Sequence, residues 1–343
     1  MGVLHARHAA ACAALLFMLM GCDAFTIPTG FAVGLRTSIR IRATALSSLS
    51  AKAQPAGDEP DLLAGSRGDA GRRDLLRLIG GGALYHALPS EARAAEGSTR
   101  GTVLVVGATG AIGQTVCQQL LGEGYAVRAL TRRTNLSDRE GREDAGWTGQ
   151  VKWVVGDLTK PQSLRGLFKG VDKVVWCAGS QAYLKGIELN RLIYAESVGI
   201  VAKLAKEEAK DLSAVVLVSS NAVTRFNDPD FGGSDYLKDV LKWKAQGEKL
   251  LRESGVPYSV LRFSAYYGGE ANPDKVWITQ GDPPGRTPMS LANLALIVSK
   301  CLSDPKYGYK TFETAEAREG RNPGGNWEEA MDKLVDDPKP VGL

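Results

Sequence analysis

From residue 102 onward, short apolar runs rich in Val and Leu alternate with longer stretches whose apolar residues recur at helical spacing. The short runs show little polar alternation, which is typical of strands buried on both faces of a sheet. The predicted strands are residues 102–106, 126–130, 151–155, 173–177, 214–219 and 258–263. The predicted helices are residues 112–121, 189–209 and 236–252. Such alternation predicts an α/β fold in which a doubly wound parallel sheet carries helices on both faces.

Two stretches rich in Gly, Pro and Asp interrupt this pattern, at residues 226–234 and 268–288. Both are predicted to be long loops, the kind of segment that often carries binding residues. The folded part is predicted to be a single domain over residues 96–343, whose small C-terminal portion contributes a substrate cleft.

Three glycines spaced three residues apart follow the first predicted strand and open the first predicted helix. The first permits a tight turn, the second lets the backbone approach a pyrophosphate, and the third lets the helix pack close to the strand. Backbone N–H groups and the positive end of the helix would then face the phosphates. The turn therefore predicts a bound dinucleotide. Its predicted cofactor-binding residues are Gly107, Thr109, Gly110, Ala111, Ile112 and Gly113.

The second predicted strand is followed by Arg132 and Arg133. In many NAD-binding folds an acidic residue near this point accepts hydrogen bonds from the ribose 2′-hydroxyl. Two guanidinium groups suit a 2′-phosphate instead, so NADP is the predicted cofactor and NAD the less favoured one. The alternative reading of the pair is a solvated basic loop.

Further cofactor-binding residues are predicted at the ends of the third and fourth strands. Asp157, followed by Leu158, lies where an adenine would bind. Its carboxylate either accepts a hydrogen bond from the adenine amino group or caps the following turn. Cys177, Ala178 and Gly179 are small residues that would let the chain pass close to the cofactor.

Charge and cysteine content narrow the function classes. The chain has 343 residues and a formal net charge of +4, and residues 1–95 hold ten basic and seven acidic residues, which leaves 32 and 31 in the remainder. A nearly neutral folded part gives no electrostatic basis for nucleic-acid binding. The folded part holds Cys117, Cys177 and Cys301, which are too widely spaced to indicate a disulfide framework or a metal site.

The first 95 residues have the composition of targeting segments. Residues 1–24 combine a weakly basic start with an apolar run too short to cross a bilayer, which is typical of a signal peptide. Residues 25–57 hold no acidic residue, which is typical of a transit peptide. A signal peptide followed by a transit peptide indicates import into a plastid. The alternative interpretation is a secreted protein with a disordered tail.

A further targeting signal is predicted within residues 25–95. Arg72 and Arg73 precede an apolar stretch and a small-residue site at residues 92–94, an order that resembles a twin-arginine thylakoid signal. The alternative is a chance arginine pair in a basic linker. We therefore predict a plastid protein, in the thylakoid lumen or the stroma, with no transmembrane segment in its mature chain.

Residues 101–334 resemble the atypical short-chain dehydrogenase/reductase superfamily, in particular its NmrA-like group with plastid members. The motifs that carry the resemblance are GATGAIG, RALTRR, VVGDLTKPQSLRGLFKGVDKVVWCAG, VVLVSS and WKAQGEKLLRESGVPYSVLR. The resemblance implies a Rossmann-type NAD(P)-binding fold. It also implies a Tyr-x-x-x-Lys pair on the helix after the fifth strand, where the tyrosine gives a proton to the substrate and the lysine lowers its pKa.

This sequence departs from the family at that pair. It contains no Tyr-x-x-x-Lys, and matching the helix to the family places Lys242 at the tyrosine position and Gln246 at the lysine position. The family's serine at the end of the fifth strand is matched by Ser219, counted with the cofactor-binding residues, or Ser220. Ser220 and Tyr266 are the remaining catalytic candidates, although a strand-end serine also bonds locally and an aromatic beside a cleft also packs.

Two classes of function remain open. One is an oxidoreductase that uses NADPH to reduce a small organic substrate with an unusual proton donor. The other is a non-catalytic NADP(H)-binding protein that senses redox state or assembles other plastid proteins. The resemblance to a superfamily of mostly reductases favours the first class. The missing Tyr-x-x-x-Lys pair favours the second. The fold does not decide between them, because one fold can carry several functions.

Overall fold

The computed structural model describes residues 100–133, 146–180, 188–283, 287–317 and 326–338. All described residues except 232–234 belong to one compact unit. The predicted targeting segments, residues 1–24 and 25–95, lie outside the described residues. None of the described helices is both long and apolar enough to span a membrane.

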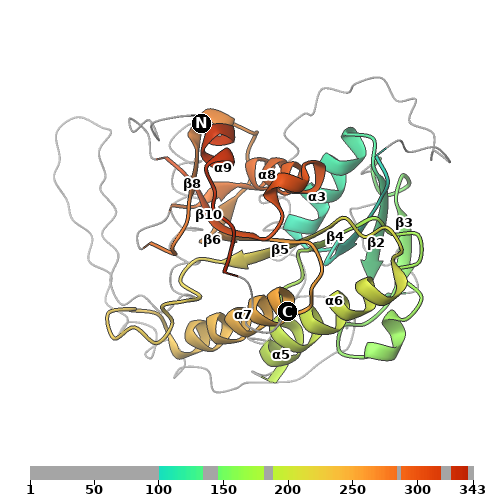
Figure 1. The fold of residues 1–343 in the computed structure, drawn as a ribbon, viewed down its shortest axis with the longest axis horizontal. Coiled ribbons are helices and arrows are strands. Elements are labelled where there is room, and N and C mark those ends of the chain that lie inside the picture. Colours follow the sequence, from blue (N-terminus) through green and yellow to red (C-terminus); the bar gives the residue numbers. More distant parts are fainter. Residues whose placement is uncertain (1–99, 134–145, 181–187, 284–286, 318–325, 339–343) are drawn as a thin grey trace, which may run out of the picture. The chain divides into compact units, whose positions relative to one another are not determined.

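Eight strands of the described residues form one sheet in the order β3-β2-β1-β4-β5-β6-β10-β8 (Figure 1). All neighbouring pairs are parallel except β10 with β8. The strands are β1 (Thr102–Val106), β2 (Ala126–Thr131), β3 (Lys152–Val155), β4 (Lys173–Trp176), β5 (Ala214–Ser220), β6 (Tyr258–Phe263), β8 (Val276–Thr279) and β10 (Lys310–Glu316). The strand order reverses between β1 and β4, and open α/β sheets bind ligands at such a reversal.

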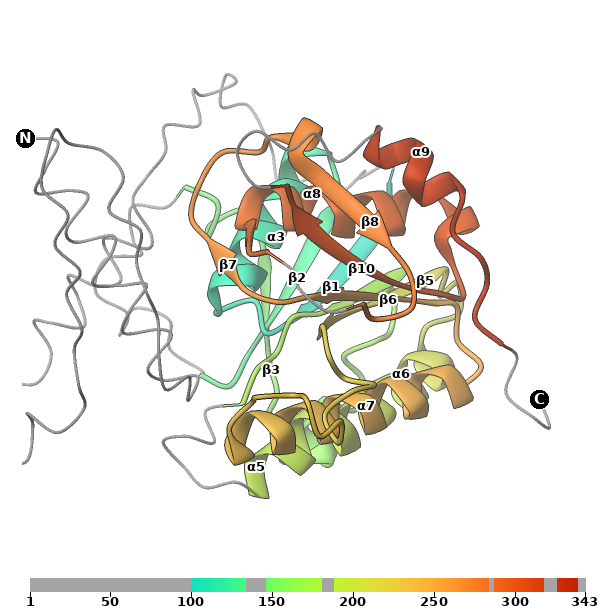
Figure 2. The same cartoon turned by 90° about the vertical axis from the view of Figure 1, so that its left-hand side faces the viewer.

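Helices cover both faces of the sheet, as Figure 2 shows. One face packs against α3 (Ala111–Gly122), α8 (Leu291–Ser303) and α9 (Trp327–Asp332), with Val105, Leu120 and Ile297 in its core. The other packs against α6 (Ser197–Glu208) and α7 (Asp235–Glu253), with Leu104, Val201 and Val260 in its core. Strand residues therefore alternate between two apolar cores, which explains their nearly continuous apolar sequence.

The predicted α/β fold is confirmed, and the six predicted strands are all present. The prediction of a long loop over residues 268–288 is wrong, because β8 lies within it, preceded by a short 3₁₀ turn (Pro273–Lys275). This strand is antiparallel to β10 at the edge of the sheet. Val276 and Ile278 are buried while Trp277 is 44% exposed, so its four residues alternate instead of forming an apolar run.

The predicted helix over residues 189–209 is present but contains a π-helical turn. It runs as α5 (Glu188–Arg191), a π segment (Leu192–Glu196) and α6. A Cβ added at Gly247 of α7 would overlap the carbonyl oxygen of Tyr194 in the π segment. The two helices therefore approach closely at this point because Gly247 has no side chain. Single π turns inside α-helices are frequent at functional sites.

The C-terminal part adds elements beyond the six predicted strands. After β6, the short strands β7 (Tyr266–Tyr267) and β9 (Met289–Ser290) form a separate parallel pair. Strand β10 contains the buried residues Glu313 and Glu316, and its polar sequence gave no strand prediction. Residues 226–234 form turns without a helix or strand, as predicted.

Candidate dinucleotide and reaction site

The glycine turn after β1 is shaped by two close backbone contacts. Gly107 has a φ of 88°, and a Cβ there would lie 2.6 Å from the backbone nitrogen of Ala178. A Cβ at Gly113 would overlap the carbonyl oxygen of Gly107. Both positions therefore require glycine, the first for its conformation and for the chain after β4, the second for the packing of α3 against the turn.

Gly110 lies in a different environment, at the position that starts α3. It is exposed, and a Cβ there would meet only the Gly107 carbonyl oxygen, at 3.4 Å. The first turn of α3, with Ala111 and Ile112, presents backbone N–H groups that no preceding carbonyl of the helix can accept. An exposed glycine before a positively polarised helix end fits a pyrophosphate. Gln114 Nε2 donates to the Thr109 carbonyl, 3.0 Å away, and ties the turn to the helix.

Arg132 and Arg133 are exposed just after the end of β2. Asp157 follows β3, the next strand in the sheet, and its Oδ1 accepts hydrogen bonds from the Thr159 backbone nitrogen at 2.9 Å and from Thr159 Oγ1 at 2.8 Å. Burial raises the pKa of Asp157, but the Thr159 hydrogen bonds and the charges of Arg132 and Lys160 outweigh it and hold that pKa below its usual value. The carboxylate therefore caps its own turn through Oδ1, and its predicted contact with an adenine stays a prediction.

The chain after β4 passes close to the glycine turn. The Cys177 nitrogen donates to the Val106 carbonyl at 2.8 Å, which continues the pairing of β4 with β1. Burial raises the pKa of the Cys177 thiol, so this group stays neutral. The Ser180 nitrogen donates to the Tyr194 hydroxyl at 2.9 Å, and Leu158 packs against the core of the α6 and α7 face. Residues 177–180 are thus fixed between the turn and the π segment.

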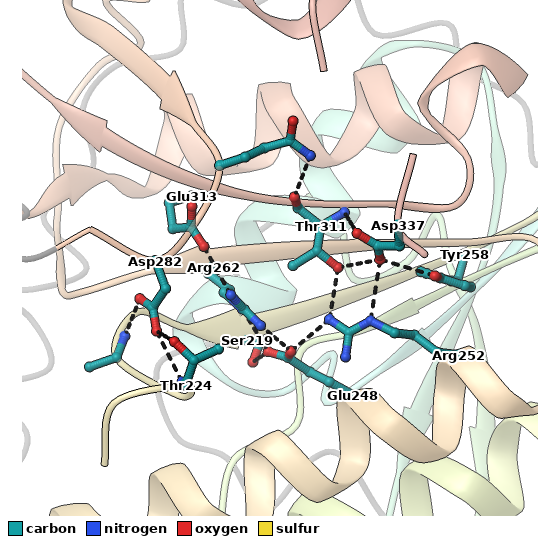
Figure 3. A network of polar contacts seen from close by, with 12 residues as sticks. Ser219, Thr224, Glu248, Arg252, Tyr258, Arg262, Asp282, Thr311, Glu313 and Asp337 are labelled. Carbon is teal, nitrogen blue, oxygen red and sulfur yellow. Dashed lines mark hydrogen bonds and ion pairs between the residues drawn. The ribbon is translucent and has the colours of Figure 1, made fainter. Parts of the chain in front are cut away.

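Ser219 and Glu248 lie in a buried polar network beneath the end of β5 (Figure 3). Ser219 Oγ donates to Glu248 Oε1 at 2.6 Å, and the Arg262 guanidinium donates to both oxygens of Glu248, at 3.1 and 2.6 Å. Arg262 also bonds Glu313 at 3.0 Å, and Arg252 bonds Glu248 at 2.9 Å. Each charge has an opposite partner, as buried charges require.

Ser220, the next residue, has a different partner on the same helix. Lys244 Nζ donates to Ser220 Oγ at 2.6 Å, and its ammonium lies 5.2 Å from the centre of the Tyr194 ring. Burial lowers the pKa of Lys244 to about 8, although the charge of Glu248 opposes the shift. Lys244 is also one of the residues that line a small pocket, together with Trp176, Tyr194, Val198, Leu217, Val218 and Ser219.

Lys244 is the functional candidate that the sequence analysis missed. Lys242, the residue matched there to the family's tyrosine, is exposed, and its ammonium lies 4.8 Å from the Trp243 ring centre. Counting back four residues from Lys244 reaches Val240, which is 8% exposed and carries no proton to give. The signal in the sequence was the spacing of Lys244 and Glu248, which puts both on one side of the helix.

The aromatic pair after β6 is placed at the rim of the fold. Tyr266 is 39% exposed, and its ring centre lies 6.3 Å from that of Phe263. Tyr267 donates its hydroxyl proton to Glu316 Oε2. Asn293 Nδ2 donates to Glu316 Oε1 at 2.8 Å, so Glu316 accepts hydrogen bonds from both residues. Within the described ranges, no group of His, Cys, Asp and Glu side chains could hold a metal ion.

Solved structures share this architecture. A putative NAD-dependent epimerase/dehydratase from Bacillus halodurans aligns over 68% of this chain and 100% of its own, with a TM-score of 0.55 and 18% identity. An oxidoreductase from Lactococcus lactis aligns over 67% of this chain and 95% of its own, with a TM-score of 0.52 and 16% identity. At these identities the likeness shows the fold alone.

Sequence relatives include chloroplast proteins at low identity. The Photosystem II assembly factor Ycf39 of Trieres chinensis is 27% identical over 169 residues, which cover 49% of this chain and 47% of that protein. An uncharacterized chloroplastic protein of Arabidopsis thaliana is 23% identical over 240 residues, which cover 64% of this chain and 70% of that protein. The chain thus spans about half the length of its Ycf39 relative. Residues 107–305, more than half of the chain, match the NAD(P)H-binding family, and the chain belongs to that family.

Proposed function

We propose that this chain is an NADP(H)-dependent reductase of a small organic substrate, an atypical member of the short-chain dehydrogenase/reductase superfamily. The observation that carries the proposal is the contact of Lys244 Nζ with Ser220 Oγ, 2.6 Å, at the end of β5. A bound nicotinamide cofactor supplies the hydride for such a reduction. The protein has to supply the accompanying proton, and Lys244 is a protonated group beside a hydroxyl at the edge where ligands bind in this fold.

Ser220 and Lys244 are arranged to pass one proton to a substrate oxygen. Because Ser220 accepts a hydrogen bond from Lys244, its own hydroxyl proton can be donated to a carbonyl oxygen. As that proton leaves, the Lys244 ammonium replaces it, so that the substrate gains one proton and Lys244 loses one. A pKa of about 8 suits this task, because a general acid works best when its pKa lies near the working pH.

NADP is the proposed cofactor in preference to NAD. Exposed guanidinium groups at Arg132 and Arg133, beside the end of β2, can bind the two charges of a 2′-phosphate. The carboxylate of Asp157 is engaged by Thr159, which leaves the arginines as the charged groups proposed to read the ribose.

The experiment that tests the reaction uses the purified full chain with NADPH and a broad panel of carbonyl, enone and quinone compounds. NADPH oxidation is followed by absorbance, and the reduced product is quantified. One molecule of reduced product for each NADPH consumed supports the proposal. Absence of product from every class overturns it.

A second candidate function is a non-catalytic assembly factor of the plastid that binds NADP(H). Two observations favour it: the Photosystem II assembly factor Ycf39 among the relatives, and Val240 where the family's spacing from Lys244 would require tyrosine. In this case the chain binds NADPH, turns over no member of the panel, and co-purifies with plastid proteins in an NADPH-dependent manner.

The proposed location is the plastid, with the thylakoid lumen as a narrower alternative to the stroma. The proposal rests on the absence of acidic residues from residues 25–57 and on chloroplastic relatives. Twin-arginine export carries folded proteins, so the Arg72–Arg73 pair would suit a domain whose cofactor site exists only after folding. A mature N-terminus near Ala95 in a protease-protected thylakoid fraction supports the lumen. A mature N-terminus well before Arg72 in the stromal fraction excludes it.

A further inference from the structure

Asn221, directly after Ser220, has a buried side chain with unmet hydrogen-bonding capacity. The residue is 9% exposed, and in the part of the chain that the structure describes neither its Nδ2 nor its Oδ1 has a hydrogen-bond partner. A buried amide without partners destabilises the fold, and such groups are rare in folded proteins. Since an amide offers a donor and an acceptor side by side, its natural complement offers the same two groups in reverse.

The backbone on both sides of Asn221 is fixed, so its side chain is presented from a rigid position. Its own nitrogen donates to the Phe263 carbonyl at 3.0 Å. Asp282, only 1% exposed, accepts from the Ala222 nitrogen at 2.6 Å and from both the nitrogen and the hydroxyl of Thr224, at 3.0 and 2.7 Å (Figure 3). These contacts hold the loop after β5 between β6 and the segment after β8.

The position of Asn221 matches the nicotinamide half of a dinucleotide. A dinucleotide lies across the point where the strand order reverses, here between β1 and β4, with its pyrophosphate at the glycine turn. The adenosine half is expected over the ends of β2 and β3, which Arg132 and Asp157 follow. The other half therefore extends over the ends of β4, β5 and β6, and Asn221 follows β5 directly.

We infer that the Asn221 side chain recognises a carboxamide-type group, with the nicotinamide carboxamide of the bound dinucleotide as its source. Asn221 Nδ2 donates to the carboxamide oxygen, and Asn221 Oδ1 accepts from the carboxamide nitrogen. The inference rests on the proposed function, because it assigns a contact within the same cofactor site. A substrate that carries an amide or lactam presents the same chemistry, and the test separates these two sources.

The test compares three nucleotides by calorimetric titration of the full chain. They are NADP, its 3-acetylpyridine analogue, in which a methyl group replaces the amide nitrogen, and 2′-phospho-ADP-ribose, which lacks the nicotinamide. The parent protein should bind NADP more tightly than the analogue. Asn221→Leu should lower the affinity for NADP by about tenfold, bring NADP and the analogue to nearly equal affinity, and leave 2′-phospho-ADP-ribose unchanged. Asn221→Asp, which keeps the shape and the acceptor, should widen the gap between NADP and the analogue.

The titrations distinguish a structural role of Asn221 from a contact with the cofactor or with a substrate. Equal losses for all three nucleotides would show that Asn221 maintains the fold, and unchanged affinity for NADP would assign the amide to a substrate; either result overturns the inference while NADP binding itself stands. Failure of the parent protein to bind even 2′-phospho-ADP-ribose would overturn the proposed function and this contact with it.

Discussion

Lys244 Nζ lies 2.6 Å from Ser220 Oγ, which joins the middle of helix α7 to the end of strand β5. Lys244 and Ser220 are 24 residues apart in the sequence. Helix α7 lies close to the helix over residues 188–208 near this contact. Gly247, about one turn after Lys244, has no side chain and leaves room for the Tyr194 carbonyl. Lys244 is neither of the two residues, Lys242 and Gln246, that the sequence matches to the tyrosine and lysine of the short-chain dehydrogenase/reductase pattern.

The pH dependence of turnover follows from the pKa of Lys244. That pKa is lowered to about 8, and a proton donor must be protonated to act, so the rate should be high below pH 8 and fall as the pH rises through about 8. Lys244→Arg should lower the rate and abolish this fall, because arginine stays protonated throughout the accessible range and does not release a proton to Ser220. A fall in rate near pH 8 that persists in Lys244→Arg would assign it to another group, and loss of activity in Tyr266→Phe alone would make Tyr266 the donor.

Cofactor preference depends on the two arginines after β2. The double substitution Arg132→Ala and Arg133→Ala should weaken NADPH binding about tenfold or more and leave NADH binding nearly unchanged, because charged hydrogen bonds to a phosphate contribute about 1.5–3 kcal/mol each before solvent screening. Arg165→Ala is the control, since Arg165 is exposed and bonds Gln162. Titrations that show equal losses for both dinucleotides would contradict the assignment.

Breaking the buried network around Glu248 should lower the free energy of unfolding of the protein. Glu248→Ala leaves the Arg262 charge without its main partner in an apolar core, and we expect the free energy of unfolding to fall by about 3–5 kcal/mol. Lys249→Ala, which removes an exposed ion pair one residue later, should change it by less than about 0.5 kcal/mol. Urea denaturation of both variants measures the difference. Similar small changes in both would mean that the network is not desolvated as described.

Gly247 should be intolerant of a side chain although it lies inside a helix. Alanine there gains about 1 kcal/mol of helix propensity, but its Cβ would overlap the Tyr194 carbonyl, so Gly247→Ala should destabilise the protein by about 1–3 kcal/mol. Gly122→Ala, at the end of α3 with open space around it, should be neutral or slightly stabilising. Thermal unfolding of the pair provides the comparison, and a stabilised Gly247→Ala would contradict the close approach.

The sequence predicts those parts of the fold whose pattern is local. Strands β1 and β6 begin and end at the predicted residues, because each is a short, mostly apolar run bounded by turn residues. The glycine turn is equally local, and its predicted cofactor class agrees with the family match. Strand β10 could not be predicted in this way, because Glu313 and Glu316 are buried against partners that are distant in sequence, Arg262 and Asn293.

The reaction site is harder to predict than the cofactor turn for a physical reason. Which lysine of α7 reaches β5 depends on how the helix is rotated against the sheet, and that rotation is set by tertiary contacts such as those of Gly247 and Glu248. Lys242 and Lys244 differ by two positions, which places them on different sides of the helix. Periodicity alone did not separate the exposed lysine from the one beside Ser220.

The most direct test of Lys244 as the proton donor compares NADPH oxidation by the parent, Lys244→Met and Lys242→Met proteins with a substrate found in the panel of carbonyls, enones and quinones. We predict that Lys244→Met lowers the turnover number by about a hundredfold or more, as expected for loss of a general acid, with NADPH affinity within a few fold of the parent. Lys242→Met should behave as the parent does. Full turnover by Lys244→Met would rule out Lys244 as the proton donor.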